Sequence, residues 1–378
     1  MYVLVIAGGI PSNEYRGNGI FEFDQAKALA RAGCKIVYAA VDVRSIRRWR
    51  KWGYERYDVD GVHVFCINVP VGRVPKNILH KISEWGLKSL YVRIQKEFGK
   101  PDVLHAHFTD IGYVAATLKQ KINVPLVITE HSSAIIQSEL NKKVVETAKK
   151  AYSDADAVIA VSPSLGNIIE NVFKIKSRWI PNIVNVKMFD YEPVRKNRDG
   201  VFRFISVGNL ILSKRIDLVI EAFNNVFSDI PNMTLTIFGE GQERPKIEKL
   251  IKQYDLEDKV KLMGMQPRLV IAKELKRSDC FVLPSRFETF GVAYIEALAT
   301  GIPVIATKCG GPECFVHESN GLLVSVDDLD ELSCAMRYMY ENNNAFDREE
   351  ISTEIRTKFS PESVAKELIK VFKEVIKP

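Results

Sequence analysis

The sequence lacks any apolar run long enough to cross a membrane. A transmembrane helix needs about 20 consecutive apolar residues, and the opening run MYVLVIA is far shorter. That run also lacks the basic leader of a secretory signal. We therefore interpret it as a first buried strand and expect a cytoplasmic protein.

The cysteines lack the spacing of a structural framework. None of the six forms a CxxC pair, and none is spaced with histidine as in a metal finger. Two lie inside apolar stretches that are typical of a strand or helix. This pattern predicts reduced core or loop thiols, as is usual for a cytosolic protein.

Neither sign of charge dominates. Lysine and arginine number 53 against 47 aspartate and glutamate residues, which gives a formal net charge of +6. This mild excess is compatible with nucleotides, lipid headgroups or nucleic acid as partners and selects none of them. With 378 residues, 46% of them hydrophobic, the chain is long enough for two domains, each with its own core.

Short β-branched runs alternate with helix-period segments along the whole chain. The strand candidates are YVLVIA, KIVYAAV, VHVFCI, DVLHAH, PLVIT and AVIAVS in the first half, and FRFISVG, LTIFG, KVKLMG, CFVLPS, PVIAT and GLLVS in the second. Strands that alternate with helices in this way predict parallel sheets with right-handed crossovers. The expected fold class is therefore α/β, with two doubly wound halves.

The domain boundaries follow from where this alternation stops. The charged run VKMFDYEPVRKNRDG (186–200) contains a proline and a glycine and interrupts it. We predict a first domain over residues 1–190, a linker over 191–200 and a second domain over 201–360. Residues 361–378 form a last helix with an apolar stripe that must be buried against another part of the protein.

The stretch FETFGVAYIEALATGIPVIA (287–306) places two acids in a mostly apolar segment. It follows the buried strand CFVLPS, so Glu288 lies in a loop at the carboxyl end of a strand, where doubly wound sheets bind ligands. Glu296 lies about a turn and a half into the next helix. Eight helical residues span about 12 Å, so the two carboxylates suit two ends of one long polyol ligand. The alternative is a capping glutamate and an incidental helix glutamate.

The start of that helix is a second feature of a ligand site. Its first backbone N–H groups, near Phe290, Gly291 and Val292, have no partner within the helix and carry a partial positive charge. Gly291 allows a ligand to approach the backbone closely. We therefore expect an anionic or hydroxyl-rich ligand at this position.

The segment PSRFETFGVAYIEALATGIPVIATKCGGPE resembles the donor-site motif of the family-four retaining glycosyltransferases (glycosyl transferases group 1), with two glutamates separated by seven residues and then a Gly-Gly pair. Other segments follow in the order of that family over nearly the whole chain: RGNGIFEFDQAKALARAG, DVLHAHF, VITEHS, ADAVIAVSPSL, IPNIVNVKMF, ISVGNLILSKRIDLVIEAF, LTIFGEGQE and VKLMGMQP. The resemblance implies the GT-B fold, in which two Rossmann-like domains face each other across a cleft. It also implies that the last helix crosses back to the first domain.

The resemblance assigns roles to residues of the second half. Glu288 would hold hydroxyl groups of a donor sugar, together with the backbone amides of Phe290 and Gly291. Glu296 would accept hydrogen bonds from a ribose. Lys214, which on its own is typical of a solvated surface lysine, would neutralise a diphosphate.

Three further positions complete the expected donor site. Many family members carry arginine where this chain has Asn209, so another group would supply part of the charge that faces the phosphates. Arg215, beside Lys214, either helps in this or faces solvent. Met265, in the turn MGMQP, would meet the nucleotide base through backbone groups.

In the first half, the resemblance places His131 beside the donor sugar, which makes it a candidate catalytic residue with Glu288 and Lys214. Gly17 and Gly19 lie in the loop after the first strand, where backbone amides would approach a phosphate or an acceptor; the alternative is a plain flexible loop. The H-x-H pair at 105–107 has no carboxylate or thiol spaced to complete a metal site. We therefore expect neither a metal nor another cofactor, with a nucleotide sugar as substrate.

Two basic stretches of the first half are candidates for contact with a membrane. RSIRRWRKWGYERY (44–57) interleaves arginine with tryptophan and tyrosine, and ILHKISEWGLKSLYVRIQK (78–96) is amphipathic. Both compositions suit an anionic membrane surface; a solvated loop and an ordinary surface helix are the alternatives. No module for nucleic-acid binding is recognisable.

The resemblance thus implies an enzyme that transfers a hexose from a UDP- or GDP-sugar to an acceptor hydroxyl with retention at the anomeric carbon. The acceptor would be a carbohydrate or a lipid-linked sugar, in polysaccharide or glycolipid assembly, with the enzyme peripheral on the inner face of the membrane. A UDP-sugar 2-epimerase of the same fold and a non-catalytic protein that only binds sugar nucleotides are the alternatives.

Overall fold

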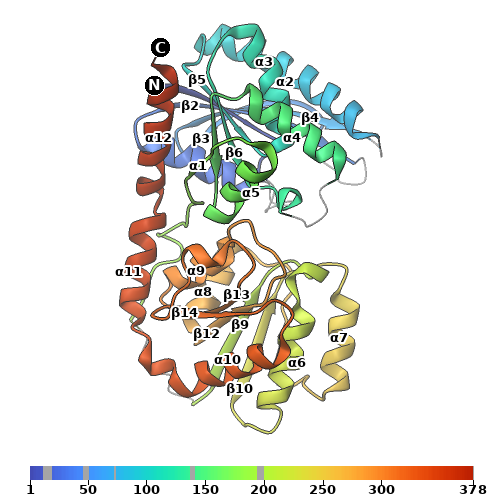
Figure 1. The fold of residues 1–378 in the computed structure, drawn as a ribbon, viewed down its shortest axis with the longest axis vertical. Coiled ribbons are helices and arrows are strands. Elements are labelled where there is room, and N and C mark those ends of the chain that lie inside the picture. Colours follow the sequence, from blue (N-terminus) through green and yellow to red (C-terminus); the bar gives the residue numbers. More distant parts are fainter. Residues whose placement is uncertain (12–18, 46–50, 72–73, 137–140, 194–199, 378) are drawn as a thin grey trace. The chain divides into compact units, whose positions relative to one another are not determined.

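In the computed structural model the chain forms two compact units, each built around its own sheet (Figure 1). Unit 1 comprises Met1–Ile183 together with Pro361–Pro378, and unit 2 comprises Val184–Ser360. The structure describes residues 1–11, 19–45, 51–71, 74–136, 141–193 and 200–377. The chain leaves unit 1 after Ile183, so the predicted domain boundary at residue 190 lies inside unit 2.

The segment before the predicted linker packs on unit 2. The ring of Phe189 is fully buried, and the guanidinium of Arg268 lies 5.5 Å from its centre. The ammonium of Lys276 donates to Asp190 Oδ1 at 2.5 Å and to Glu192 Oε1 at 2.6 Å. These contacts hold the chain on unit 2 well before residue 200; residues 194–199 of the predicted linker lie outside the described residues.

The sheet of unit 1 has, within the described residues, eight strands in the order β3-β4-β2-β1-β5-β6-β7-β8. The strands are β1 (Tyr2–Ala7), β2 (Lys35–Arg44), β3 (Gly53–Val59), β4 (Val62–Pro70), β5 (Val103–His107), β6 (Leu126–Glu130), β7 (Ala157–Ala160) and β8 (Arg178–Trp179). Neighbouring strands run parallel except β3 and β4, which form an antiparallel hairpin at one edge. Asp60 and Gly61, both with positive φ, close this hairpin in the two-residue turn typical of Asp-Gly.

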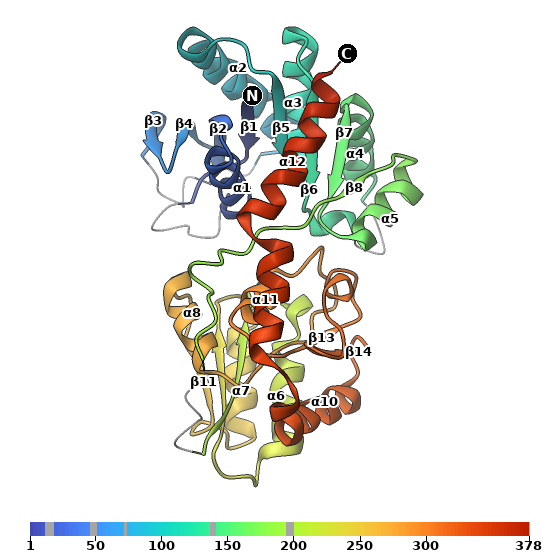
Figure 2. The ribbon, with the colours of Figure 1, turned by 90° about the vertical axis from the view of Figure 1, so that its left-hand side faces the viewer.

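Helices cover both faces of this sheet (Figure 2). Helices α1 (Ile20–Arg31) and α12 (Pro361–Ile376) lie on one face, and α2 (Lys76–Phe98) and α3 (Thr109–Ile122) lie on the other. The unit also contains α4 (Lys142–Asp154) and α5 (Pro163–Phe173). Helix α1 stops because Gly33 adopts a left-handed conformation (φ 86°). The N–H groups of Gly33 and Cys34 then donate to the carbonyls of Ala30 and Leu29, which satisfies the end of the helix.

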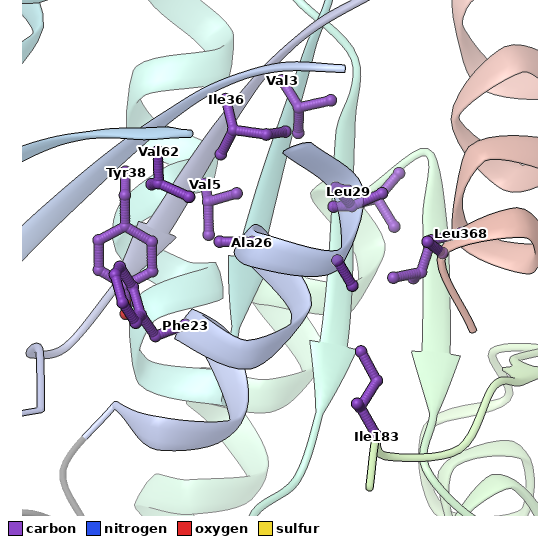
Figure 3. Close-up of a cluster of buried hydrophobic side chains, with 14 of the residues drawn as sticks. Val3, Val5, Phe23, Ala26, Leu29, Ile36, Tyr38, Val62, Ile183 and Leu368 are labelled. Atoms are coloured by element: carbon purple, nitrogen blue, oxygen red, sulfur yellow. The ribbon is translucent and has the colours of Figure 1, made fainter. Parts of the chain in front are cut away.

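Helix α12 helps to build the core of unit 1. Its side chains Val364, Leu368, Val371 and Phe372 are almost fully buried in the same cluster as α1 and β1. Figure 3 shows Leu368 beside Leu29 of α1 and Ile183. Burial of one such side chain contributes about 1.5–3 kcal/mol. The helix predicted over residues 361–378 therefore belongs to unit 1.

The sheet of unit 2 has, in the described part of the chain, six strands, all parallel, in the order β11-β10-β9-β12-β13-β14. The strands are β9 (Phe202–Val207), β10 (Met233–Phe238), β11 (Val260–Leu262), β12 (Cys280–Leu283), β13 (Val304–Thr307) and β14 (Gly321–Val324). The helices of this unit are α6 (Ile216–Phe227), α7 (Arg244–Gln253), α8 (Arg268–Arg277), α9 (Val292–Ala299), α10 (Leu329–Asn342) and α11 (Arg348–Phe359). The chain extends the sheet outward from β9 through β10 and β11, then returns to β12 on the other side of β9. The loops after β9 and β12 therefore flank the topological switch point, where ligands of such sheets bind.

Candidate functional site

Two of the predicted site residues meet at this switch point. Lys214 ends a short 3-10 turn (Leu212–Lys214) after β9, and Glu288 lies in the loop after β12. The ammonium of Lys214 donates to Glu288 Oε1 at 2.5 Å, although the residues are 74 positions apart. Only 20% and 12% of the two side chains are exposed. The residues assigned to a diphosphate and to a sugar are therefore direct partners in the structure.

The Glu288 carboxylate is held by more than this ion pair. The hydroxyl of Ser285 donates to the same oxygen at 2.9 Å, and the carbonyl of Ser285 accepts from Thr307 Oγ1 at 2.5 Å. The backbone of Glu288 bridges to Gly310, in the loop after β13. Because two neighbouring loops fix it, the carboxylate is preorganised. The contribution of Ser285 was not predicted from the sequence.

The start of α9 lies directly after this loop. Gly291 precedes the helix with φ 96°, and a Cβ there would lie 2.6 Å from the ring of Tyr294. A Cβ at Gly311 would lie 2.5 Å from the carbonyl oxygen of Phe290. Glycine is thus required at both positions for the chain to pack this closely. No side chain of the described residues caps α9, so Val292 begins the helix with its positive dipole end uncovered.

Glu296, in the middle of α9, has a partner that the sequence did not predict. Its side chain is buried, and Arg268, the first residue of α8, donates to Glu296 Oε1 through Nε at 3.1 Å and also through Nη2. The two acids of the motif are thus each joined to a different cation. Arg268 fixes one oxygen of the carboxylate that we assigned to a ribose.

Arg215, expected either to help bind the phosphates or to face solvent, is paired with carboxylates of unit 2. It is only 12% exposed and pairs with Asp217, through Nε at 3.1 Å, and with Asp327. Burial acts to raise the pKa of Asp217, but hydrogen bonds from Lys246 and Arg215 lower it overall. Arg215 therefore neither faces solvent nor offers an uncompensated charge to a phosphate. Asn209, in the loop after β9, is exposed.

Glycines after β10 support the loop that carries Lys214. A Cβ at Gly239 would lie 1.9 Å from the carbonyl oxygen of Gly208, and one at Gly241 would lie 2.1 Å from that of Leu210. The segment FGEGQE therefore packs backbone against backbone on the loop after β9. Met265, expected near the base, follows β11 and is 63% exposed.

In unit 1, His131 follows β6 and is buried next to a second histidine. His107 Nδ1 lies 3.1 Å from His131 Nε2, and both rings are more than nine-tenths buried. Burial lowers the pKa of His131 to about 3 and that of His107 well below its usual value. Both imidazoles are therefore neutral near pH 7. Among the described residues, no group of three histidines, cysteines or acids is arranged to hold a metal ion.

The loop after β1 is described only in part. Gly19 precedes α1 with φ 70°, and a Cβ there would lie 2.5 Å from the carbonyl oxygen of Gly9. Gly19 therefore closes this loop against the end of β1. Gly17, the second glycine expected to approach a phosphate or an acceptor, lies outside the described residues.

The two stretches expected at a membrane differ in the structure. In 44–57, Arg44 pairs with Asp42 at 2.6 Å, and Arg56 pairs with Asp58 and Glu97, both at 2.7 Å. These arginines are neutralised within unit 1, and 46–50 lies outside the described residues. The stretch 78–96 falls wholly within α2. None of the helices in the described ranges is long and apolar enough to cross a bilayer.

Comparisons with known proteins match both halves of the chain. The family model Glycosyltransferase Family 4 matches residues 19–187, and the model Glycosyl transferases group 1 matches residues 189–358. The uncharacterized glycosyltransferase MJ1059 of Methanocaldococcus jannaschii is 31% identical over 258 residues, which are 62% of this chain and 63% of that protein. This chain therefore matches less than two-thirds of the length of that relative.

Solved structures show the same fold. Sucrose-phosphate synthase from Thermosynechococcus elongatus superposes with a TM-score of 0.81 at 22% identity, covering 99% of this chain and 98% of that one. Anabaena Alr3699/HepE in complex with UDP-glucose superposes with a TM-score of 0.74 at 18% identity, covering 99% and 100%. The expected fold class is confirmed, and the chain belongs to the group 1, family 4 glycosyltransferases of the GT-B fold.

Proposed function

We propose that the protein transfers a hexose from a nucleoside diphosphate sugar, UDP- or GDP-linked, to an acceptor hydroxyl with retention at the anomeric carbon. The observation that carries this proposal is the ion pair of Lys214 and Glu288 at the switch point of unit 2, next to the uncapped start of α9. One group is suited to a phosphate and the other to sugar hydroxyls. Membership of the family and the UDP-glucose complex of a structural neighbour support the choice of donor.

The charges of this site suit the reaction. The barrier lies in separating an oxocarbenium-like sugar from a leaving diphosphate, and groups aimed at the developing negative charge lower it. Lys214 and the N–H groups at the start of α9 would bind the diphosphate. When Lys214 turns to the phosphates, Glu288 becomes available to sugar hydroxyls, while Ser285 still holds it in place. Glu296, fixed by Arg268, would bind the ribose.

The remaining steps need no further protein group in this proposal. A phosphate oxygen of the leaving group would take the proton of the acceptor hydroxyl as the new glycosidic bond forms, and no side chain is assigned as a covalent nucleophile. Lys214 and the helix start would supply the positive charge, so we propose a reaction without a metal ion. Transfer in the presence of EDTA is the expected result, and its loss would contradict this part.

The experiment that tests the function is a screen of UDP-, GDP- and ADP-sugars. A donor that binds only the native state raises the melting temperature, and the donors found in this way are then incubated with carbohydrate and lipid-linked acceptors. The expected result is a new α-linkage formed from an α-linked donor, observed by NMR. Epimerised sugar without any acceptor would support the epimerase instead, and nucleotide binding without turnover would support the non-catalytic alternative.

We also propose that unit 1 binds an anionic membrane surface through α2, where a lipid-linked acceptor would be reached. Ile78, Trp85 and Val92 are 41%, 58% and 68% exposed, and their seven-residue spacing places them on one line along the helix. Lysines 81, 88 and 96 lie within one turn of this stripe. An apolar line flanked by lysines is the pattern of a helix that lies in a membrane interface.

Flotation with vesicles that contain anionic lipid tests this second proposal. The double variant Trp85→Ser/Val92→Ser should bind about 10- to 100-fold more weakly, because each side chain loses part of the roughly 1.5–3 kcal/mol of burial. The double variant Val172→Ser/Trp179→Ser is a matched control, since these residues are exposed to 43% and 49% elsewhere on unit 1. Equal binding by the two variants, or indifference to lipid charge, would rule out α2 as the contact.

A further inference from the structure

Unit 1 has a topological switch point of its own. The chain extends its sheet outward from β1 to β2 and β4, then returns to β5 on the other side of β1. The loops after β1 and β5 therefore flank the position where a doubly wound sheet binds a ligand, as the loops after β9 and β12 do in unit 2. In the proposed function unit 2 holds the donor, and transfer needs a second ligand, the acceptor.

A pocket of about 180 Å³ lies at this switch point, between α2 and α3. We call it the α2–α3 pocket. Gly8, directly after β1, contributes to its wall. Aliphatic side chains of β2, α2 and α3 form its apolar part: Val41, Val43, Leu79, Ile111 and Val114. An apolar cavity of about 150 Å³ holds one benzene molecule, so this pocket has room for one six-membered ring.

Polar side chains of α2 and α3 line the same pocket: Lys76, His80, Ser83 and Asp110. The ammonium of Lys76 lies 2.9 Å from Asp110 Oδ1, and His80 Nε2 lies 3.1 Å from the same oxygen. Both contacts use Oδ1, so Oδ2 of Asp110 takes part in neither. The side chains of Lys76 and Asp110 are 42% and 45% exposed. These polar groups are therefore accessible to a ligand in the pocket.

The charge of Asp110 selects against an acidic ligand. Burial acts to raise the pKa of Asp110, but hydrogen bonds from His80 and Lys76 lower it overall. The carboxyl group is therefore ionised near pH 7. An acidic group in the pocket would lie beside this carboxylate, and Lys76 is already paired with it. Like charges at such short distances repel each other.

The polar groups also select against a purely apolar ligand. An apolar ring would displace water from Asp110 and Ser83 without replacing the lost hydrogen bonds, which is unfavourable. A neutral ring that carries hydroxyl groups suits both parts of the pocket. Its C–H groups would contact the aliphatic wall, and its hydroxyl groups would hydrogen-bond to the polar side chains. A sugar ring has this chemistry.

We propose that the α2–α3 pocket binds one neutral sugar ring of the acceptor, with Asp110 Oδ2 accepting a hydrogen bond from a ring hydroxyl. The word acceptor rests on the proposed function, whereas the binding of a neutral sugar does not depend on catalysis. Lys76 and His80 orient the carboxylate through Oδ1. Asp110 then determines which acceptor is bound. The alternative is an ion pair that only joins α2 to the start of α3.

Methyl NMR of the protein tests the binding without any activity. The Cδ1 methyl group of Ile111 belongs to the wall of the pocket, and Ile111→Val assigns its signal. Methyl glycosides of neutral hexoses are added at millimolar concentration, and a hexuronic acid and a hexose phosphate serve as acidic probes. We expect the signal to shift with at least one neutral glycoside and less with the acidic probes. No shift with the neutral glycosides, or a shift as large with the acidic probes, would overturn the proposal.

Asp110→Asn tests the role of the carboxylate. Asparagine keeps the shape of the side chain and removes its charge, so the sugar should bind about 10- to 100-fold more weakly. Asp58→Asn is the matched control, because Asp58 of unit 1 also pairs with a basic side chain, Arg56, and with a histidine, His63, both at 2.7 Å. Equal sugar affinity of the two variants would show that Asp110 only joins α2 to α3.

Gly8→Ala tests the pocket with a change that the fold accommodates. A Cβ at Gly8 would lie 3.5 Å from Ile111 Cδ1, which is an ordinary contact. The protein should therefore fold normally while a methyl group reduces the pocket. Gly166→Ala, on α5, is the matched control, since its Cβ would lie 3.1 Å from the hydroxyl of Ser177. We expect weaker sugar binding in Gly8→Ala only, and an unchanged affinity there would overturn the proposal.

Kinetics connects the pocket to transfer. With an active donor, Asp110→Asn should raise the KM of the acceptor about 10- to 100-fold and leave the KM of the donor unchanged. A fall in kcat at an unchanged acceptor KM would overturn the assignment of the pocket to the acceptor. If no donor supports transfer by the wild type, the proposed function fails, while the methyl signal of Ile111 still decides whether the pocket binds a neutral sugar.

Discussion

The substitution Lys214→Met separates a binding residue from a simple counter-ion of Glu288. In the wild type the ammonium lies 2.5 Å from the carboxylate, and both side chains are mostly buried. Methionine keeps the length of the side chain and removes the charge. Glu288 would then keep only the hydroxyl of Ser285 as a partner among the contacts described above.

Two effects of different size are expected from this change. Breaking a fully buried ion pair by removing one partner costs about 3–5 kcal/mol, but both side chains retain some contact with water, so we expect about 1–2 kcal/mol of stability to be lost. That loss corresponds to a fall of roughly 2–8 °C in the melting temperature. Loss of a charge aimed at the leaving phosphate should lower kcat by about 10²- to 10³-fold.

The double variant Lys214→Met/Glu288→Gln resolves the two effects. Removing both charges leaves no unpaired ion, so calorimetry should show stability close to that of the wild type. Transfer should remain as low as in the single variant, because the cation is still absent. Lys252→Met, on the exposed surface of α7, is the control lysine in unit 2. Normal turnover by Lys214→Met, or recovery of turnover in the double variant, would refute a role for Lys214 beyond pairing with Glu288.

Three further results are expected from the same structure. Glu296→Gln should weaken UDP or GDP binding by about 1–3 kcal/mol, since a charge-assisted hydrogen bond is lost; an unchanged dissociation constant in calorimetry would contradict the ribose assignment. Gly311→Ala should lower the stability of the protein by about 1–3 kcal/mol, because its Cβ would lie 2.5 Å from the carbonyl oxygen of Phe290. An unchanged melting temperature would show that the loop shifts to make room for the methyl group. The buried histidines His105, His107 and His131 of unit 1 have lowered pKa values in the folded state, so the unfolded chain takes up protons first as the pH falls. Their contribution to the free energy of unfolding is complete above about pH 6.5. It is lost as the pH falls toward about 3, by up to about 1.4 kcal/mol per pH unit for each histidine. Urea unfolding between pH 7 and pH 4 measures this slope, and a flat profile would contradict neutral buried rings.

Much of the fold could be predicted because its signals are local. All twelve strand candidates correspond to strands of the structure, since β-branched runs between helix-period segments are visible in any short window. The strand β3 was not predicted, because its residues alternate exposed and part-buried at the edge of the sheet and lie in a stretch rich in arginine and tryptophan. The predicted domain boundary, residue 190, lies seven residues after the end of unit 1 at Ile183 for a similar reason. The buried Phe189 stands among charged residues in the sequence, so the segment was interpreted as the start of a linker.

The sequence by itself determined the two alternating halves, the glycine before α9, the acid Glu288 in the loop after a strand and the acid Glu296 in the helix that follows that loop. Only the tertiary structure decided which charges meet. Lys214 reaches Glu288, and Arg268 reaches Glu296, across 74 and 28 positions of the chain. The tertiary structure also brought His107 and His131 together at the ends of the neighbouring strands β5 and β6. Helix and strand periodicity depends on residues a few positions apart, whereas the energy of an ion pair or hydrogen bond depends on distance and burial in space.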